Sequence, residues 1–250
     1  MGDEPRRAPR FYLDVPLRAG GTCALGEDAA HHAVRVLRLR AGDAIVLFDG
    51  RGGEYAARIA AIERLRVAVD ILEHRQIERE SPLRAVLVQG VSAGDRMDFT
   101  VRKAVELGVA ELRPLIAARS VARPRAHNAP ARQAHWQKVA IAACEQCGRN
   151  RIPVVQPLIR AADYRVEASD GSLKLLLAPR AELAFAAACA GAGRGVTIAA
   201  GPESGFDAGE EQAFLAAVFV PVRLGPRVLR TETAALAALA ALNALAGDFR

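Results

Sequence analysis

The chain has 250 residues, and its 34 basic side chains outnumber 28 acidic ones, which gives a net charge of +6. Three of the basic residues are lysine and 31 are arginine, while alanine accounts for 52 residues of an apolar fraction of 51%. The larger apolar residues are still present in an ordinary globular share, which excludes a mainly disordered or fibrous chain, and the length allows one large or two small domains.

The N-terminal part reads as short strands separated by turns. Strands are predicted at Ala44–Phe48 and Glu54–Ile59, and the glycines between them favour a hairpin. Leu65–Leu72 alternates as a further strand. We therefore expect a small β-barrel-like domain over residues 1–74 and a polar linker over residues 75–82.

A basic run without any acid lies inside this first domain, at residues 31–40. If the run is helical, His31, Val34 and Leu37 share one face, and Arg35 and Arg38 lie on another. Arginine suits RNA because its planar group pairs with phosphate and stacks on bases. This run is a candidate RNA-binding element.

After residue 82 the pattern changes to alternating strands and helices. The expected strands are Ala85–Val88, Leu112–Ile116, Ile152–Val155, Leu173–Leu177, Val196–Ala199 and Val222–Leu224, and the expected helices are Asp98–Leu107, Ala131–Cys147 and one from about Thr231. This alternation predicts an α/β domain with a mainly parallel sheet over residues 83–250. Pro114 suggests that its strand lies at an edge of the sheet or that the proline lies at the strand's end.

The positive charge of this second domain is concentrated. Residues 113–165 carry a net charge of +8, and the rest of the chain carries −2. A concentrated excess of this kind can hold a phosphate backbone, although a solvated basic face explains it equally well.

Three of the predicted strands end in loops of similar composition. They are Leu177–Arg180, Ala200–Gly205 and Leu224–Arg227. Ligands of open α/β sheets lie beyond the carboxyl ends of the strands, so these loops are expected to line one pocket. Gly-Pro pairs are also ordinary turn formers, but three such loops at consecutive strand ends favour the pocket.

The residues that follow the third loop start the last helix. Thr231 or Thr233 can cap that helix, and Glu232 is favourable in its first turn. Capping explains the threonines, but it does not explain Arg230 at the mouth of the expected pocket.

Two of these segments carry a resemblance to a known family. Gly201–Phe206 and Leu224–Ala234 closely resemble the signature of the small-subunit ribosomal RNA uridine-N3 methyltransferases, which belong to the SPOUT superfamily. The similarity extends over nearly the whole chain, through Arg10–Tyr12 and His31–His32 in a PUA-like RNA-binding domain and Gly94–Asp98 in the catalytic domain.

The resemblance implies an S-adenosylmethionine-dependent enzyme that methylates N3 of one uridine in small-subunit ribosomal RNA, free or within the assembled subunit. It also implies a trefoil-knotted catalytic domain and a homodimer. Arg230, Glu145 and Glu203 are the candidate catalytic residues, with Arg230 steadying negative charge on the uracil and a glutamate accepting the N3 proton. Pairing of Glu145 with Arg149 one helical turn later is an equally good reading of that glutamate.

The resemblance also implies the residues that bind the cofactor and the RNA. The cofactor-binding set is Leu177, Ala178, Pro179, Gly201, Pro202, Glu203, Gly205, Leu224, Gly225, Leu229, Arg230, Thr231, Thr233 and Ala234. The RNA-binding set is Arg10, His32, Arg35, Arg38, Arg119 and Arg149.

This chain departs from the family pattern at two positions, Ser204 and Ala93, where the family usually has Gly and Lys. A positive φ at residue 204 would cost roughly 1–2 kcal/mol with serine.

Two other functions are open to the sequence. The first is a non-catalytic RNA-binding protein that kept the SPOUT fold, and it would have lost the cofactor loops that this chain retains. The second is a zinc or redox protein built on Cys144 and Cys147, for which a second C-x-x-C pair is missing. We expect no metal.

The sequence also bears on where the protein acts. The first residues have no apolar stretch behind them, and no run approaches the roughly 20 apolar residues of a membrane span. We expect a cytoplasmic protein without a membrane anchor.

Overall fold

A computed structural model describes residues 8–120, 128–165 and 171–249. The chain divides into two compact units. The first comprises Met1–Glu80 together with Cys144–Ile152, and the second comprises Ser81–Ala143 together with Pro153–Arg250. No helix of the described segments is long and apolar enough to cross a bilayer.

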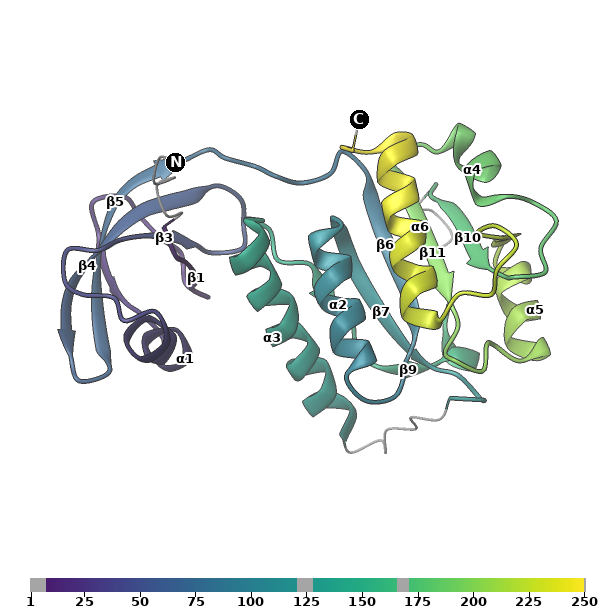
Figure 1. The fold of residues 1–250 in the computed structure, drawn as a ribbon, viewed down its shortest axis with the longest axis horizontal. Coiled ribbons are helices and arrows are strands. Elements are labelled where there is room, and N and C mark those ends of the chain that lie inside the picture. The colour runs from purple at the N-terminus through teal and green to yellow at the C-terminus, as the bar shows by residue number, and fades with distance from the viewer. Residues whose placement is uncertain (1–7, 121–127, 166–170, 250) are drawn as a thin grey trace. The chain divides into compact units, whose positions relative to one another are not determined.

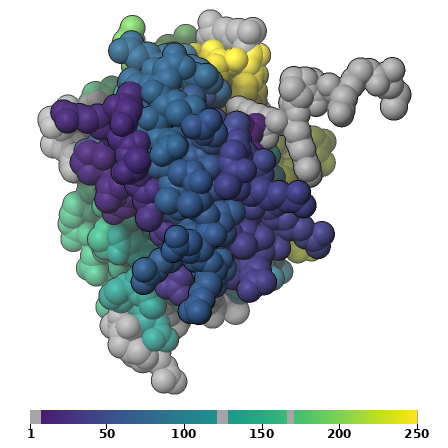
Figure 2. All heavy atoms as spheres, turned by 90° about the vertical axis from the view of Figure 1, so that its left-hand side faces the viewer, coloured from purple at the N-terminus to yellow at the C-terminus, as the bar shows by residue number. Residues whose placement is uncertain are grey.

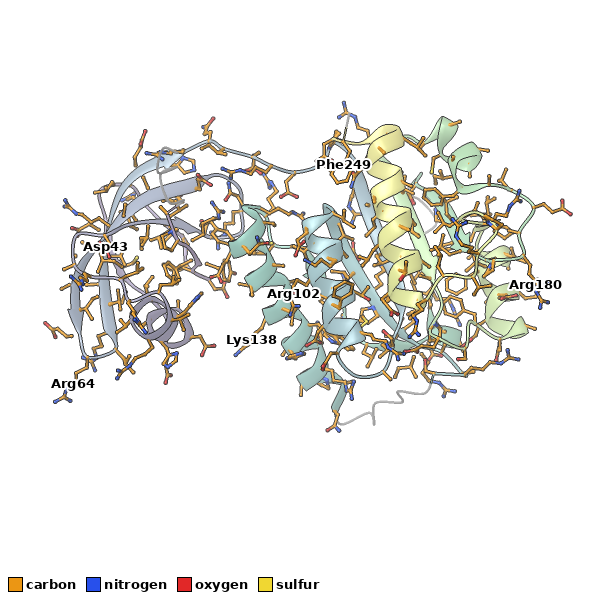
Figure 3. The ribbon with its side chains drawn as sticks, in the orientation of Figure 1. Asp43, Arg64, Arg102, Lys138, Arg180 and Phe249 are labelled. Atoms are coloured by element: carbon orange, nitrogen blue, oxygen red, sulfur yellow. The ribbon has the colours of Figure 1, made fainter. Side chains whose placement is uncertain are left out.

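The first unit contains a five-stranded sheet in the order β1-β3-β4-β5-β2 (Figure 1). Its elements are β1 (Arg10–Tyr12), β2 (Thr22–Ala24), α1 (Glu27–His31), the π-helix η1 (His32–Val36), β3 (Ala44–Phe48), β4 (Glu54–Glu63) and β5 (Arg66–Arg75). The predicted hairpin is confirmed, because β3 and β4 pair antiparallel with Ala44 opposite Arg58. Arg64 projects from the turn of the next hairpin, between β4 and β5 (Figure 3). The segments of this unit form a continuous face in Figure 2.

The basic run at residues 31–40 differs from the predicted regular helix. Its π-helical turn, in which the amide of Leu37 donates to the carbonyl of His32, shifts the side-chain period. Ala30 and Ala33 are therefore buried in the core of the sheet, whereas His31 is exposed and Leu37 is 38% exposed. Of the three residues predicted to share one face, Val34 packs partly buried against the core, whereas His31 and Leu37 are exposed.

The second unit is built on a seven-stranded sheet in which every strand pair is parallel. Its order is β12-β10-β11-β6-β7, and β7 pairs further with both β8 and β9. The strands are β6 (Arg84–Gly90), β7 (Val109–Ile116), β8 (Val154–Val155), β9 (Ile159–Arg160), β10 (Leu173–Leu177), β11 (Gly195–Ala200) and β12 (Val220–Val222). The prediction of a mainly parallel α/β domain is confirmed.

Helices cover this sheet and connect its strands. They are α2 (Arg96–Glu106), α3 (Ala129–Cys147), η3 (Ala161–Asp163), α4 (Phe185–Ala188), η4 (Cys189–Gly191), α5 (Ala208–Ala216) and α6 (Thr231–Ala246). Helices α2 and α6 lie side by side against the sheet, and α6 contacts β6 and β11 (Figure 1). Phe214 of α5 packs into a second core with Val88, Leu176 and Ala199.

Two strand predictions need correction. Strand β7 is not at an edge, since it pairs with β6 on one side and with β8 and β9 on the other. Pro114 is tolerated there because the pairing passes from β8, opposite Leu112, to β9, opposite Leu115. Strand β12 ends at Val222, earlier than predicted, so Leu224 belongs to the loop.

Candidate active site

A single pocket lies where the three predicted loops meet. Because β12, β10 and β11 are parallel neighbours, their carboxyl ends share one edge of the sheet. The cavity has a volume of about 470 Å³. It is lined by Arg96, Leu177, Ala178, Pro179, Ala200, Gly201, Pro202, Glu203, Gly205, Phe206, Glu211, Val222, Leu224, Arg227, Val228, Leu229, Arg230, Thr231, Glu232 and Ala234. Arg180, which ends the first loop, lies at the outer edge of this unit (Figure 3).

The start of α6 is fixed to the pocket wall through Thr231. This side chain is 6% exposed; its hydroxyl donates to the carbonyl oxygen of Gly201 and accepts a 2.9 Å hydrogen bond from Nε2 of Gln89. The ends of β6 and β11 are packed equally closely, because a Cβ at Gly90 would lie 2.4 Å from the nitrogen of Pro202. The ends of β6 and β11 and the start of α6, which are far apart in sequence, are thereby packed together as one wall of the pocket.

Position 204 carries none of the strain considered for a serine there. Gly205, not Ser204, adopts the left-handed conformation, with a φ of 71°. The hydroxyl of Ser204 donates to the carbonyl of Arg119 at 2.6 Å. Serine therefore adds a link between the loop and the segment after β7.

Glu203 is held in an ion pair at the rim of the pocket. Its Oε1 accepts from Nη1 of Arg96 at 2.8 Å and from the amide of Ala93 at 3.1 Å. Burial by itself raises the pKa of this carboxyl, but hydrogen bonds from the amides of Glu203 and Ala93 and the charge of Arg96 outweigh it, so the pKa is lowered. A carboxylate held in this way is a weak proton acceptor.

Two other charged groups of the pocket differ from Glu203 in having free polar atoms. Arg230 occupies the N-cap position of α6, and its exposed guanidinium has no partner in the described parts of the chain. Glu232, in the first turn of α6, has one carboxylate oxygen, Oε2, that is shielded from solvent and unpartnered among the described residues.

The pocket contains most of the predicted cofactor-binding residues. Gly225 and Thr233 are not among the lining residues; Gly225, with a φ of 73°, shapes the loop, and Thr233 is exposed on α6. Ala200 and Arg227, which belong to the loops predicted to line the pocket, are in the lining although they were not in the predicted cofactor-binding set. Sequence reasoning missed the lining residues Arg96, Phe206, Glu211, Val222, Val228 and Glu232. For Arg96 and Glu232 a signal existed, since each lies inside a segment that carries the family resemblance.

Glu145 is not among the lining residues and belongs to the N-terminal compact unit. There its Oε1 accepts from the backbone amide of Tyr12 at 2.9 Å, and burial raises the pKa of its carboxyl. Arg149, its partner in the alternative reading of Glu145, forms a hydrogen-bonded ion pair with Glu80.

The predicted RNA-binding residues fall into two groups. Arg10 and Arg149 are 8% and 4% exposed, and Arg10 bonds Glu54 and Asn150, so their burial does not support contact with a phosphate backbone. His32, Arg35, Arg38 and Arg119 are exposed. Arg123 and Arg125 of the basic middle segment lie outside the described residues.

Cys144 and Cys147 are free cysteines, and Cys147 is half-buried. Cys144 is buried, its Sγ lies 3.7 Å from the carbonyl of Arg151, and burial raises the pKa of its thiol to about 12. Within the described segments, no three His, Cys, Asp or Glu side chains are grouped as a metal site would require.

Comparison with known protein families shows the class of protein to which this chain belongs. Residues 79–243 match the model of an RNA methyltransferase domain, and residues 25–72 match that of an RNA methyltransferase PUA domain. The fold and the pocket are thus those of an RNA methyltransferase with a PUA-like domain.

Full-length relatives define the family more narrowly. Ribosomal RNA small subunit methyltransferase E of Bacillus subtilis is 32% identical over 94% of this chain and 95% of its own length. The protein of that name from Buchnera aphidicola (Acyrthosiphon pisum) is 30% identical over 98% of this chain and 96% of its own. The crystal structure of the Neisseria gonorrhoeae enzyme of that name, bound to S-adenosyl methionine, superposes with a TM-score of 0.90 at 39% identity, covering 98% of this chain and all of that one. This chain belongs to the ribosomal RNA small subunit methyltransferase E family.

Proposed function

We propose that this protein transfers a methyl group from S-adenosylmethionine to N3 of one uridine in small-subunit ribosomal RNA. The observation that carries the proposal is the convergence of three strand-end loops and the first turn of α6 on one pocket. Relatives bearing the name small subunit methyltransferase E, and a neighbour of that name bound to S-adenosyl methionine, support the cofactor and the RNA.

The residues of the pocket fit this cofactor. A volume of about 470 Å³ lies within the range usual for small-molecule sites. Leu177, Leu224 and Leu229 offer apolar contacts to a flat base, and Gly201 and Gly205 leave room for close approach of the backbone. When bound there, S-adenosylmethionine would supply an electrophilic methyl group on its sulfonium.

The protein's own groups then have three tasks: to hold the RNA, to orient the uracil and to take up its N3 proton. The exposed side chains of His32, Arg35, Arg38 and Arg119 can neutralise phosphates. The target base must leave its stack, at a cost of a few kcal/mol. Arg230 lies at the pocket with free N–H donors, and it stabilises negative charge on the uracil carbonyls as N3 loses its proton.

The expected quaternary and topological features belong to the same proposal. We propose that the protein is a homodimer and that its catalytic domain contains a trefoil knot. We further propose that the first domain ends at residue 74, that the second begins at residue 83, and that the protein acts in the cytoplasm, where ribosomal RNA is available. Sedimentation of the purified protein tests the dimer, and two protomers per particle is the expected result.

The activity is tested by mapping modified uridines in cells that lack the protein. One N3-methyluridine should disappear from small-subunit ribosomal RNA, and the purified protein with S-adenosylmethionine should restore it, on naked RNA or on isolated subunits. Loss of no N3-methyluridine would refute the assigned activity. Calorimetry separates the non-catalytic alternative, since an RNA-binding protein without the cofactor site would show no binding at millimolar S-adenosylmethionine.

A further inference from the structure

Three carboxylates line the pocket, and they differ in what their oxygens contact. Glu203 is occupied by Arg96 and by the amide of Ala93. Glu211 is exposed on α5. Glu232 alone among these three has an oxygen, Oε2, that is both shielded from solvent and without a hydrogen-bond partner within the described chain.

An acceptor oxygen in this state is available to a donor that enters the pocket. A shielded polar atom without a partner is destabilising relative to one that is hydrogen-bonded. Placement in the first turn of α6 offsets part of this cost, because the helix N-terminus favours a negative charge. One oxygen of this side chain, Oε2, is thus available to an incoming N–H or O–H group.

Uracil carries a donor of this kind, the N–H group at N3. Its N3–H lies between two carbonyl oxygens, so its edge presents one donor flanked by two acceptors. A carboxylate oxygen complements the donor, and a guanidinium complements an adjacent carbonyl. Glu232 and Arg230, two residues apart, supply this pair on the wall of one pocket.

We propose that Oε2 of Glu232 is the general base that removes the N3 proton of the target uridine. This inference rests on the proposed function and assigns its proton acceptor. As the N3–H bond breaks, the proton passes to Oε2; N3 gains its bond to the methyl carbon while the S–C bond breaks and leaves its electron pair on sulfur. The proton is then released to solvent as the product departs.

The surrounding structure supports this role in preference to the two glutamates favoured by sequence. Thr231, next to Glu232, is tied to Gly201 and Gln89, so the backbone that carries the base is fixed. The other charged groups of the pocket are Arg96 from α2, Glu211 from α5, Glu203 after β11, and Arg227 and Arg230 before α6. The three arginines balance the three carboxylates, so Glu232 works in a nearly neutral pocket.

The test compares Glu232→Gln with Glu182→Gln, which removes the same charge from an exposed position that does not line the pocket. At neutral pH and saturating substrates, Glu232→Gln should lower turnover by about 10²–10⁴-fold, the usual contribution of a general base. Glu182→Gln should keep the wild-type rate. Glu232→Asp, which retains a carboxylate at a changed distance, should fall between them.

A substrate whose N3 proton is easier to remove distinguishes a general base from a residue that only binds the cofactor. RNA with 5-fluorouridine at the target has a more acidic N3–H, and alkaline solution ionises N3 without help. Both should rescue Glu232→Gln, so that its defect shrinks at least tenfold, whereas the wild-type rate should change little. A defect that is the same on both RNAs and at both pH values would overturn the proposal.

Binding and stability measurements complete the test. Calorimetry should give Glu232→Gln an affinity for S-adenosylmethionine within twofold of wild type, and its thermal unfolding should be cooperative. If its affinity falls in parallel with activity, Glu232 is a cofactor ligand and not the base. If the wild-type protein makes no N3-methyluridine, the proposed function itself fails, and that outcome is independent of any Glu232 variant.

Discussion

The arginines of this protein serve two different purposes at the scale of single residues. Arg10 and Arg149 are buried and paired with Glu54 and Glu80, whereas Arg227 and Arg230 are exposed at the pocket. A composition rich in arginine could not separate these two uses, because burial depends on the neighbours that folding brings. Among these arginines, Arg230 is the one for which a catalytic role can be tested most directly.

Replacing Arg230 with alanine should reduce turnover without unfolding the protein. The guanidinium has no partner in the described chain, so its loss should change the free energy of unfolding by no more than about 0.5 kcal/mol. Loss of one group that stabilises developing charge should lower kcat about 10²–10³-fold. Single-turnover methylation and thermal unfolding check the two effects. Arg180→Ala, an exposed arginine outside the lining, is the control. Wild-type turnover in Arg230→Ala would show that the guanidinium has no part in catalysis.

At the scale of elements, the end of α5 shows how tertiary packing overrides local preference. The amide of Val218 donates to the carbonyl of Leu215, and that of Phe219 donates to the carbonyl of Phe214, which is a Schellman motif. Val218 holds the left-handed position with a φ of 60°, where glycine is usual and a β-branched residue is strained. The motif is retained because the rings of Phe214 and Phe219 pack with centroids 5.0 Å apart.

Replacing Val218 with glycine should stabilise the protein. The side chain is 71% exposed, so little packing is lost, and relief of left-handed strain is worth roughly 1–2 kcal/mol, partly offset by the entropy of glycine. We expect a net gain of about 0.5–1 kcal/mol in the free energy of unfolding by urea. Val220→Gly, at an extended position in β12, should destabilise instead; equal effects at both positions would contradict the strain argument.

At the scale of the whole molecule, a buried ion-pair network joins segments that are distant in sequence. Glu54 of β4 accepts from Nη1 of Arg10 at 2.5 Å and from Nη1 of Arg79 at 2.9 Å. Arg10 also reaches the side chain of Asn150, and Arg79 reaches the carbonyl of Gly148. The turn after α3 is thereby held within the N-terminal compact unit.

Replacing Glu54 with glutamine should destabilise this unit in a way that depends on pH. Removing one partner of a buried pair leaves Arg10 uncompensated and should cost about 3–5 kcal/mol at neutral pH. Burial raises the pKa of Glu54, but hydrogen bonds from Arg79 and Arg10 outweigh it, so the net pKa is lowered. A lowered folded pKa means that the stabilisation is present above the unfolded pKa and is lost as pH falls through the folded one.

The stability gap between wild type and Glu54→Gln should therefore narrow on acidification, measured by urea unfolding from neutral pH downward. Glu73→Gln is the matched control, since Glu73 pairs with Arg75 on the surface, where such pairs contribute little. A gap that stays constant with pH would show that the carboxylate charge of Glu54 is not what stabilises the unit.

Much of the fold and of the pocket was predictable from sequence. The longer strands of both sheets follow from short-range alternation and apolar runs, and the pocket loops follow from small residues at strand ends, because these signals act between near neighbours. The short strands β1, β2 and β9, of two or three residues each, were not predicted. The bounds of β12 and the π-turn at His32–Val36 did not follow, since they depend on hydrogen bonds chosen by packing.

The sequence by itself determined the α/β class, the hairpin, the loops of the pocket and the family. Only the tertiary structure decided which charged groups are free to act: it pairs Glu203 with Arg96, places Glu145 on the amide of Tyr12, buries Arg10 and Arg149, and leaves one oxygen of Glu232 without a partner in the described chain. The physical reason is that the basicity and reach of a charged side chain depend on its solvation and on its partners. Those partners lie up to 140 positions away in the chain, as Asn150 does from Arg10.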